Sequence, residues 1–351
     1  MAQLLELADR HYAYGKELQS SAAGKLLSLW RGVDRRHIFA SWTEALPEAI
    51  AVVTATQLAA AEDGAAYMAA ALAEQSLDTK GRAVNPKAFA GLAYPLDENT
   101  PPMDLAGVLV SPAFTALQGL RGGMAPDRAM SSGLSNLMLR SQMQVSDAAR
   151  NSGSVVMSTR RKPAGYVRML NPPSCSRCAI LAGRWYRANQ GFRRHPGCDC
   201  RHIPCAEDAA DDLTTDPYEY FRSLPAAEQS RIFTNDGARA IRDGADIYQV
   251  VNARRGMSTS AGGSLVTTEG VTRRGNWGGQ QQTRDRKGTE RYGRSIRQRM
   301  MPEEIYKRAG NNQERALSLL QEYGYITPAG QAPGGAIVGG ARGFTGRYRT
   351  G

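Results

Sequence analysis

Cysteine and histidine are concentrated in one short segment of this sequence. All five cysteines and two of the four histidines lie within 31 residues: Cys175, Cys178, His195, Cys198, Cys200, His202 and Cys205. In Cys175-Ser-Arg-Cys178 two residues separate the thiols, a spacing that lets two thiolates bind one metal ion from a tight turn. A disulfide framework usually spreads an even number of cysteines across a small secreted domain. The segment therefore predicts a metal site, with structural zinc as the cofactor.

A tetrahedral zinc site needs four ligands, and the segment offers seven candidates. The spacing favours the four thiols of Cys175, Cys178, Cys198 and Cys200, with His195 as the strongest substitute for one of the last two. Cys205 and His202 are weaker candidates, which suit hydrogen bonds to the ligands. The alternative is a group of reduced cysteines that pack beside a proline-rich turn without any metal.

An enzymatic interpretation is also available, with Cys175 or Cys178 as a nucleophile and His195 as its base. A thiol enzyme needs only one cysteine and a third group that orients the base, so five clustered cysteines are better explained by metal binding. The cluster contains no glutamate that could act as the general base of a catalytic zinc. The sequence also lacks a Walker loop and the H-E-x-x-H and G-x-S-x-G motifs. We therefore expect a protein that is not an enzyme.

The formal net charge is +11, and the positive charge is concentrated in two blocks. Residues 158–205 contain ten lysines and arginines against one acid, and residues 251–300 contain eleven against three. Such blocks favour contact with a polyanion, of which nucleic acid is the commonest, although a solvated surface is the simpler interpretation of any one cluster. Trp277 and Tyr292 lie within the second block and could stack on bases. The candidate nucleic-acid contacts are Arg273, Arg274, Arg284, Arg286 and Lys287.

Apolar residues recur at helical spacing before the cluster and again after it. They predict helices near residues 3–29, 44–75, 104–120, 132–157, 224–233, 236–253, 301–309 and 313–323. Pro47 fits the first turn of the second helix. His11 lies on the apolar side of the first helix, where a packed imidazole is far more common than a ligand. Short strands are expected at 166–170 and 184–186, on either side of the Cys-x-x-Cys motif.

These elements predict a mainly α fold with a small α+β metal-binding unit. The expected organisation is a helical N-terminal region at 1–125, a domain at 126–253 with the cluster at 166–205, a flexible basic linker at 254–300, a short helical hairpin at 301–326 and a disordered glycine-rich tail at 327–351. No membrane span is expected, because the most apolar stretch, residues 49–61, is interrupted by Thr54, Thr56 and Gln57. The first fifteen residues lack the features of a signal peptide, which favours a reducing compartment.

The cluster also resembles a known family. Residues 171–186, NPPSCSRCAILAGRWY, and residues 195–204, HPGCDCRHIP, are similar to the core of the phage Mu F-like minor head proteins. The resemblance is specific over 166–205 and looser over the rest of 127–255, where residues 218–233 match a helix that commonly follows. The metal ligands that it implies are Cys175, Cys178, His195, Cys198 and Cys200, and Cys205 and His202 are additions to the simplest pattern.

The resemblance implies a minor capsid protein of a tailed bacteriophage, made in the cytoplasm of the host bacterium and located in the phage head. Its expected partners are the portal and capsid proteins and the packaged double-stranded DNA, with a role in head morphogenesis and in DNA packaging or delivery. The main alternative is a zinc-stabilised nucleic-acid-binding protein without a virion role. A third interpretation, a thiol-dependent hydrolase, predicts that Cys175→Ser abolishes a cleavage and leaves the fold intact.

Overall fold

The computed structural model is mainly helical, with two small three-stranded sheets. It describes residues 2–77, 83–95, 103–159, 165–171, 174–182, 185–188, 200–205, 216–271, 277 and 298–326. The chain divides into two compact units, one of residues 1–167 and 186–213 and the other of residues 168–185 and 214–351. Within the described ranges, no helix combines the length and the apolar character needed to cross a membrane.

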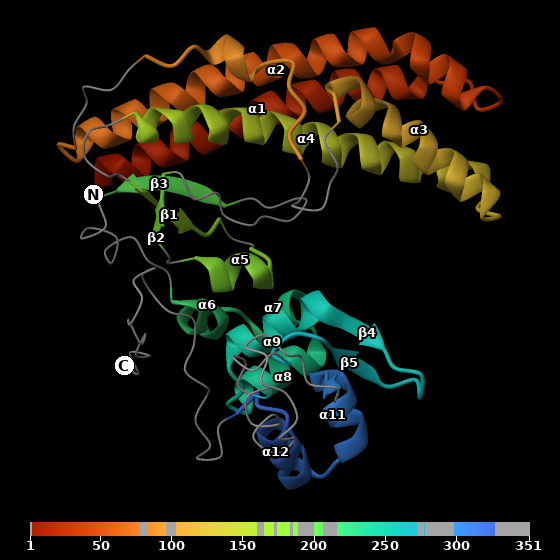
Figure 1. Ribbon diagram of the computed structural model, residues 1–351, viewed down its shortest axis with the longest axis vertical. Helices are drawn as coiled ribbons and strands as arrows, with labels where there is room; N and C mark the ends of the chain where they lie inside the picture. Colours follow the sequence, from red (N-terminus) through yellow and green to blue (C-terminus); the bar gives the residue numbers. More distant parts are fainter. Residues whose placement is uncertain are drawn as a thin grey trace, which may run out of the picture. The chain divides into compact units, whose positions relative to one another are not determined.

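Four long helices dominate the described part of the first unit: α1 (Ala2–Arg31), α2 (Ile38–Glu74), α3 (Leu105–Arg121) and α4 (Pro126–Ser158). Helices α1, α2 and α4 run alongside one another, and the shorter α3 packs against α2 and α4 (Figure 1). The four predicted helices are confirmed. Pro47 differs from its predicted place, because α2 begins nine residues earlier and the proline lies inside the helix. Helix α4 packs on the other three, so the boundary expected at residue 125 separates elements that share one core.

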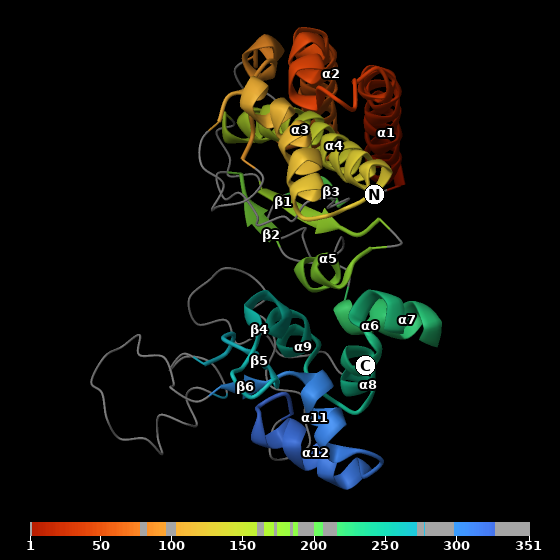
Figure 2. The same ribbon diagram turned by 90° about the vertical axis from the view of Figure 1, so that its right-hand side faces the viewer.

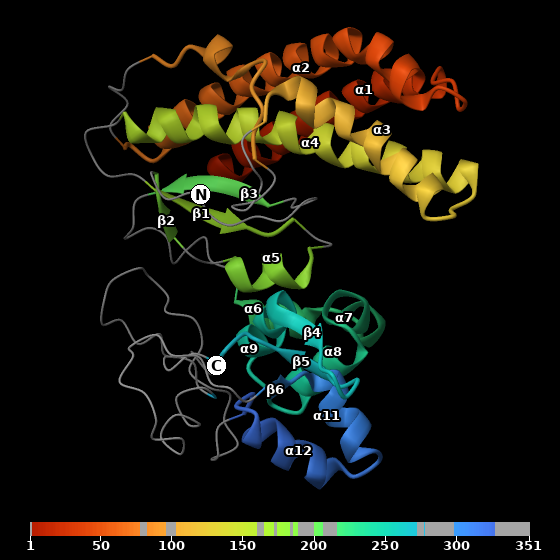
Figure 3. The same cartoon turned by 45° about the vertical axis from the view of Figure 1, so that its right-hand side comes forward.

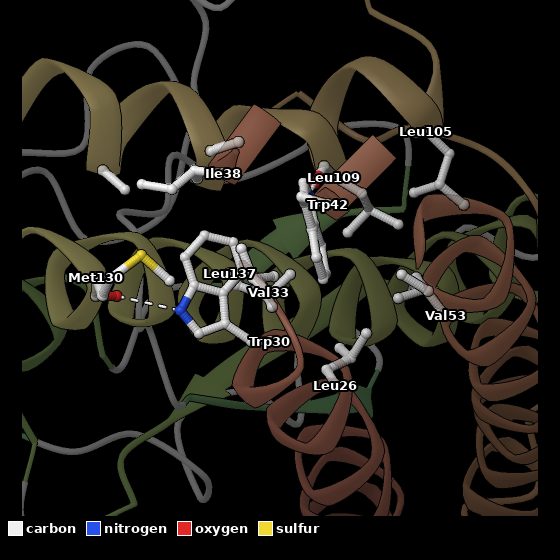
Figure 4. Close-up of a cluster of buried hydrophobic side chains, with 13 residues drawn as sticks. Leu26, Trp30, Val33, Ile38, Trp42, Val53, Leu105, Leu109, Met130 and Leu137 are labelled. Carbon is white, nitrogen blue, oxygen red and sulfur yellow. Dashed lines mark hydrogen bonds between the residues drawn. The ribbon is translucent and has the colours of Figure 1, made fainter. Parts of the chain in front are cut away.

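The core of this unit is built around two tryptophans (Figure 4). The rings of Trp30 and Trp42 meet edge to face, with their centroids 5.0 Å apart. Each indole N–H finds a main-chain acceptor, since Trp30 Nε1 donates to Met130 O at 3.2 Å and Trp42 Nε1 donates to Leu109 O at 2.8 Å. A buried indole usually has such a partner, and these two bonds attach α1 to α4 and α2 to α3.

Small residues bring α2 and α4 close together. A Cβ atom added to Gly64 would lie 2.4 Å from Ala149 O, and Ser152 Oγ donates to Ala61 O at 2.8 Å. The serine- and alanine-rich face of the α4 segment is the feature that predicts such packing, because small side chains let two helix backbones approach. Each side chain in this contact is therefore limited in size by the main chain of the facing helix.

Histidine 11 is a packed side chain of the first unit, as predicted. Its ring stacks on Tyr67 with the centroids 4.3 Å apart, and its Nδ1 is hydrogen-bonded to Asp63. Tyr67 Oη in turn donates to His202 O at 2.8 Å. This bond fixes strand β3 (Arg201–Cys205) to α2, where Gln75 Nε2 also donates to Pro204 O.

Strand β3 belongs to a sheet with the order β2-β1-β3, and β1 and β3 lie side by side in Figure 3. The other two strands are β1 (Gly165–Met169) and β2 (Trp185–Arg187). Both were expected from the alternation of side chains around the Cys-x-x-Cys motif, and both predictions are confirmed. The sheet thus places its strands directly before and after the segment that carries this motif.

The second unit contains several short helices: α5 (Ser176–Leu181), α6 (Pro217–Ser223), α7 (Ala226–Phe233), α8 (Asn235–Arg242) and α9 (Ile247–Ala253). The single helix predicted at 236–253 is divided into α8 and α9. Gly244 has φ +95°, which ends α8, and Asp246 then caps α9 by accepting hydrogen bonds from two main-chain N–H groups. A left-handed glycine followed by a capping aspartate is therefore the physical reason for the difference.

The beginning and end of the segment predicted as a flexible linker are ordered differently. After the short turn η3 (Arg254–Gly256), strands β4 (Met257–Thr259), β5 (Leu265–Thr267) and β6 (Arg299–Met300) form an antiparallel sheet. Val266 pairs with Ser258 on one side and Met300 on the other. The buried side chains of Val266, Thr267 and Met300 give this glycine-rich segment enough packing to form a sheet.

Two helices follow β6, α11 (Pro302–Ala309) and α12 (Gln313–Glu322), and they lie next to each other in Figure 2. They confirm the predicted helical hairpin. Gly310, with φ +58°, turns the chain between them, and Gly324, with φ +69°, follows the second helix. The predicted tail at 327–351 and most of the predicted linker lie outside the described residues.

Candidate metal centre

The Cys-x-x-Cys motif forms the turn that begins helix α5. Cys175 is the N-cap residue of this helix, and its Sγ accepts a hydrogen bond from the N–H of Cys178 at 3.4 Å. A main-chain N–H that donates to the first sulfur is compatible with a thiolate at that position, because it supplies positive charge to the sulfur. Cys178 is buried and Cys175 is half-buried. The sequence spacing thus places the two thiols on one tight turn, as predicted.

The residues in front of Cys175 hold this turn in place. Asn171 N–H donates to Ser174 Oγ at 3.1 Å, and Ser174 Oγ donates to Asn171 O at 2.9 Å. The hydroxyl of Tyr220, on α6, accepts from Ser174 N–H and donates to Ser174 O, both at 3.0 Å. Burial raises the pKa of Tyr220, so the phenol keeps the proton that it donates. The turn is therefore preorganised by hydrogen bonds that do not involve either sulfur.

A buried arginine lies directly beside the second thiol. Arg168, on β1, has no exposed surface, and its Nη2 donates to Cys178 Sγ at 3.3 Å. A guanidinium next to a sulfur atom stabilises the thiolate form, which is the form that binds metal. It also offsets part of the negative charge that several thiolates would bring to one site.

The other predicted ligands are distributed differently. His195 and Cys198 lie outside the described residues. Cys200 precedes β3 in the first compact unit, whereas Cys175 and Cys178 belong to the second. Both Cys200 and Cys205 are buried, and the His202 ring stacks on Tyr166 with the centroids 4.6 Å apart. His202 and Cys205 therefore occupy packed positions on a strand, as expected of the two weaker candidates.

The donor chemistry fits zinc, and the described part of the site supplies two of the four ligands that zinc needs. Two thiolates from one turn are the usual first half of a structural zinc site. Among the described residues, no group of three or more histidine, cysteine or acidic side chains is placed to hold a metal ion. The remaining ligands of a tetrahedral site would come from His195, Cys198 and Cys200.

Three residues of the site were not predicted from the sequence: Arg168, Ser174 and Tyr220. Only Arg168 gave a signal, because an arginine in the middle of the alternating segment Tyr166–Leu170 has to be either exposed or paired. Ser174 and Tyr220 meet 46 residues apart in the chain. Their contact depends on how α5 and α6 pack, which no local pattern indicates.

The structure also bears on the candidate nucleic-acid contacts. Arg273, Arg274, Arg284, Arg286, Lys287 and Tyr292 lie outside the described residues. Trp277 is described, and it is buried against the segment that follows α12, with its ring centroid 6.1 Å from that of Tyr323. A buried indole has no face free for a nucleobase, so stacking of Trp277 on nucleic acid, which the sequence suggested, is not what this structure presents.

No protein-family model, curated protein or solved structure matches the chain at a significant level.

Proposed function

We propose that the chain is a non-enzymatic structural protein of a tailed bacteriophage, a minor capsid protein bound to the portal and capsid proteins in the phage head. Its role would be in head morphogenesis and in the packaging or delivery of DNA. The observation that carries the proposal is the turn at Cys175 and Cys178, because its motif is the one that resembles the Mu F-like minor head proteins and its geometry suits two thiolate ligands.

In this proposal zinc is a structural staple. Cys175 and Cys178 would bind it from the turn of α5, and the other ligands would come from His195, Cys198 and Cys200. A zinc ion bound in this way stabilises a small domain, because its binding free energy contributes to folding. Arg168 would stay beside Cys178 and moderate the charge of the thiolates.

The helical unit supports a role in protein assembly. Phe39 and Phe114 are 44% and 48% exposed, and their ring centroids are 5.4 Å apart at the surface of α2 and α3. Large exposed apolar side chains that lie together are typical of surfaces that bind other proteins. This pair is where we expect a capsid or portal protein to make an apolar contact.

The zinc proposal predicts about one zinc ion per chain and a lower melting temperature after chelation. Cys178→Ser should remove the metal and reproduce the effect of the chelator, since it deletes one ligand of four. Cys205→Ser is the matched control, because Cys205 lies outside the family pattern, and its zinc content should be unchanged. Metal analysis and thermal melts check both. A metal-free preparation that melts at the same temperature as the untreated protein would contradict the zinc staple.

The virion proposal is tested by sedimentation. A tagged chain produced during phage infection should sediment with purified heads and with the portal, at a small number of copies per particle. Heads purified from the same infection should lose the protein when Phe39 and Phe114 are both replaced by serine, if that surface makes the contact. Recovery of the chain only in the soluble fraction, away from heads of normal composition, would reject a virion role.

A nucleic-acid-binding protein without a virion role is the second candidate, favoured by the two basic blocks of the sequence. It predicts salt-dependent binding to duplex DNA without any capsid component. Changing the five candidate contacts to glutamine should then reduce the slope of log affinity against log salt by up to about 4, because each phosphate contact contributes about 0.9. Equal losses from five exposed basic residues of the helical unit would show nonspecific attraction; this control set is Lys25, Arg31, Arg36, Arg121 and Arg128.

A further inference from the structure

Two buried glutamines of the helical unit bind the main chain of a surface segment. Gln57, on α2, donates from Nε2 to Leu92 O and accepts from Gly91 N–H, both at 2.8 Å. Gln144, on α4, donates from Nε2 to Tyr94 O at 2.8 Å and accepts from Tyr94 N–H at 2.6 Å. Neither glutamine has any exposed surface, so the segment covers them. We call the site formed by these two side chains the glutamine groove.

The glutamine groove recognises an extended backbone. A carboxamide presents one acceptor and two donors, so each glutamine pairs with a main-chain N–H and a C=O in the way that a neighbouring β-strand would. The segment it holds contributes little side-chain burial, since Leu92 is 45% exposed and none of residues 83–95 is buried. Four hydrogen bonds to the main chain are therefore opposed by an ordering cost of similar size.

One position of the segment is selective. Gly91 has φ +74°, and a Cβ atom there would meet Thr54 at an ordinary contact distance of 3.7 Å. Space is available, but an L-residue rarely adopts this backbone conformation. The groove therefore favours an occupant with glycine three residues before the residue that pairs with Gln144. The chain's own Gly-Leu-Ala-Tyr sequence at 91–94 satisfies this requirement, and so does the same segment of any other copy.

We propose that the glutamine groove is an exchangeable receptor, in which residues 91–94 of a second copy of the chain can replace the chain's own segment and link the two copies. The segment of the same chain is favoured mainly by its high effective concentration, because the bonds themselves are identical in both cases. Copies held close together would remove this advantage, and exchange of an identical element is a low-cost route to association. This inference does not depend on the proposed function.

A synthetic peptide tests the receptor. Gly91→Pro removes one N–H and cannot adopt a positive φ, while Ala90, with φ −97° and ψ 145°, has the conformation that a following proline favours. The full-length Gly91→Pro chain should therefore keep the groove and release the segment. A fluorescent peptide of residues 86–95, PKAFAGLAYP, should bind this variant saturably and bind the wild-type chain more weakly, because its own segment competes.

The controls separate groove binding from adhesion. N-methylation of the peptide at Tyr94 removes the N–H that Gln144 accepts, and should weaken binding about tenfold. Adding Gln144→Leu to the variant should have the same effect, whereas Gln142→Leu, at an exposed position of the same helix, should have none. If circular dichroism shows that the Gly91→Pro chain does not fold, Tyr94→Pro serves as the release variant. Binding that ignores both N-methylation and Gln144→Leu, or no binding at millimolar peptide, overturns the proposal.

Exchange between copies is tested by mixing two full-length variants. The Gly91→Pro chain has a groove but no competent segment, and a Gln57→Leu/Gln144→Leu chain has a competent segment but no groove. At concentrations above the peptide dissociation constant, native mass spectrometry should show a one-to-one complex of the two, and neither variant alone should dimerise. Absence of the mixed complex under these conditions, with the peptide bound, overturns exchange between copies.

Discussion

Alanine at position 64 should destabilise the helical unit, whereas alanine at position 24 should stabilise it. Both substitutions replace a helical glycine, and both remove the same conformational freedom from the unfolded chain. They differ in their surroundings, because nothing lies within 4 Å of a Cβ atom at Gly24, while at Gly64 it would lie 2.4 Å from Ala149 O and 2.9 Å from Ala149 Cα. The obstacle at Gly64 is main chain, so α2 and α4 would have to separate.

The expected magnitudes follow from these two effects. At Gly24 the helix propensity of alanine should raise the free energy of unfolding by up to about 1 kcal/mol. At Gly64 overpacking should lower it by about 1–3 kcal/mol after the same gain in propensity. Because the chain has two compact units, hydrogen exchange should be followed separately in peptides from α2, α4 and the second unit. The second unit should be unaffected by either change.

The opposite signs are the critical result. If both alanines stabilise the protein, α2 and α4 do not approach as closely as the structure shows. If both destabilise it by a similar amount, the effect belongs to the helices themselves and not to their contact. A larger residue gives an additional check, because Gly64→Val should be worse than Gly64→Ala, while Gly24→Val should lose only the difference in helix propensity.

Most of the helices could be predicted from the sequence, because apolar spacing over many residues is a strong signal. Helices α1 to α4 are long enough for the signal to accumulate, and their predicted bounds differ from the observed ones mainly at the start of α2 and α4. The sheet of β4, β5 and β6 could not be predicted in this way. Val266 pairs with Met300, 34 residues further along the chain, and strands of two or three residues carry no period of their own.

The candidate metal centre divides along the same line. The spacing of Cys175 and Cys178 was enough to predict a tight turn that brings two thiols together, and the structure has that turn. The neighbours that tune it, Arg168 and Tyr220, reach it through the packing of β1 and α6 on α5, which is not a local property of the sequence. Gln57 makes the same point, because the sequence indicated only that it interrupts an apolar stretch, whereas in the fold it binds the main chain of another segment.

Loss of the buried guanidinium at position 299 should have a comparably large effect in the second unit. Arg299, on β6, is 1% exposed, and it donates to three main-chain oxygens: Tyr323 O at 2.8 Å, Gly324 O at 3.3 Å and Glu269 O at 3.3 Å. Its guanidinium also lies over the Tyr325 ring, 4.0 Å from the centroid. Burial lowers the pKa of Arg299, and the charges of Asp246 and Glu269 act in the opposite direction.

Arg299→Met should therefore lower the free energy of unfolding by about 3 kcal/mol, since it leaves three buried carbonyl groups without their donor. Lysine should not rescue the variant, because one ammonium cannot reproduce the planar set of donors. Arg315→Met, at an exposed position of α12, is the matched control and should change stability by no more than about 0.5 kcal/mol. Hydrogen exchange should show the loss in β5 and α12 and not in α1 to α4. If the methionine at 299 is as stable as the one at 315, the hydrophobic gain of the longer apolar side chain offsets the lost bonds, and Arg299 does not hold the end of this unit together.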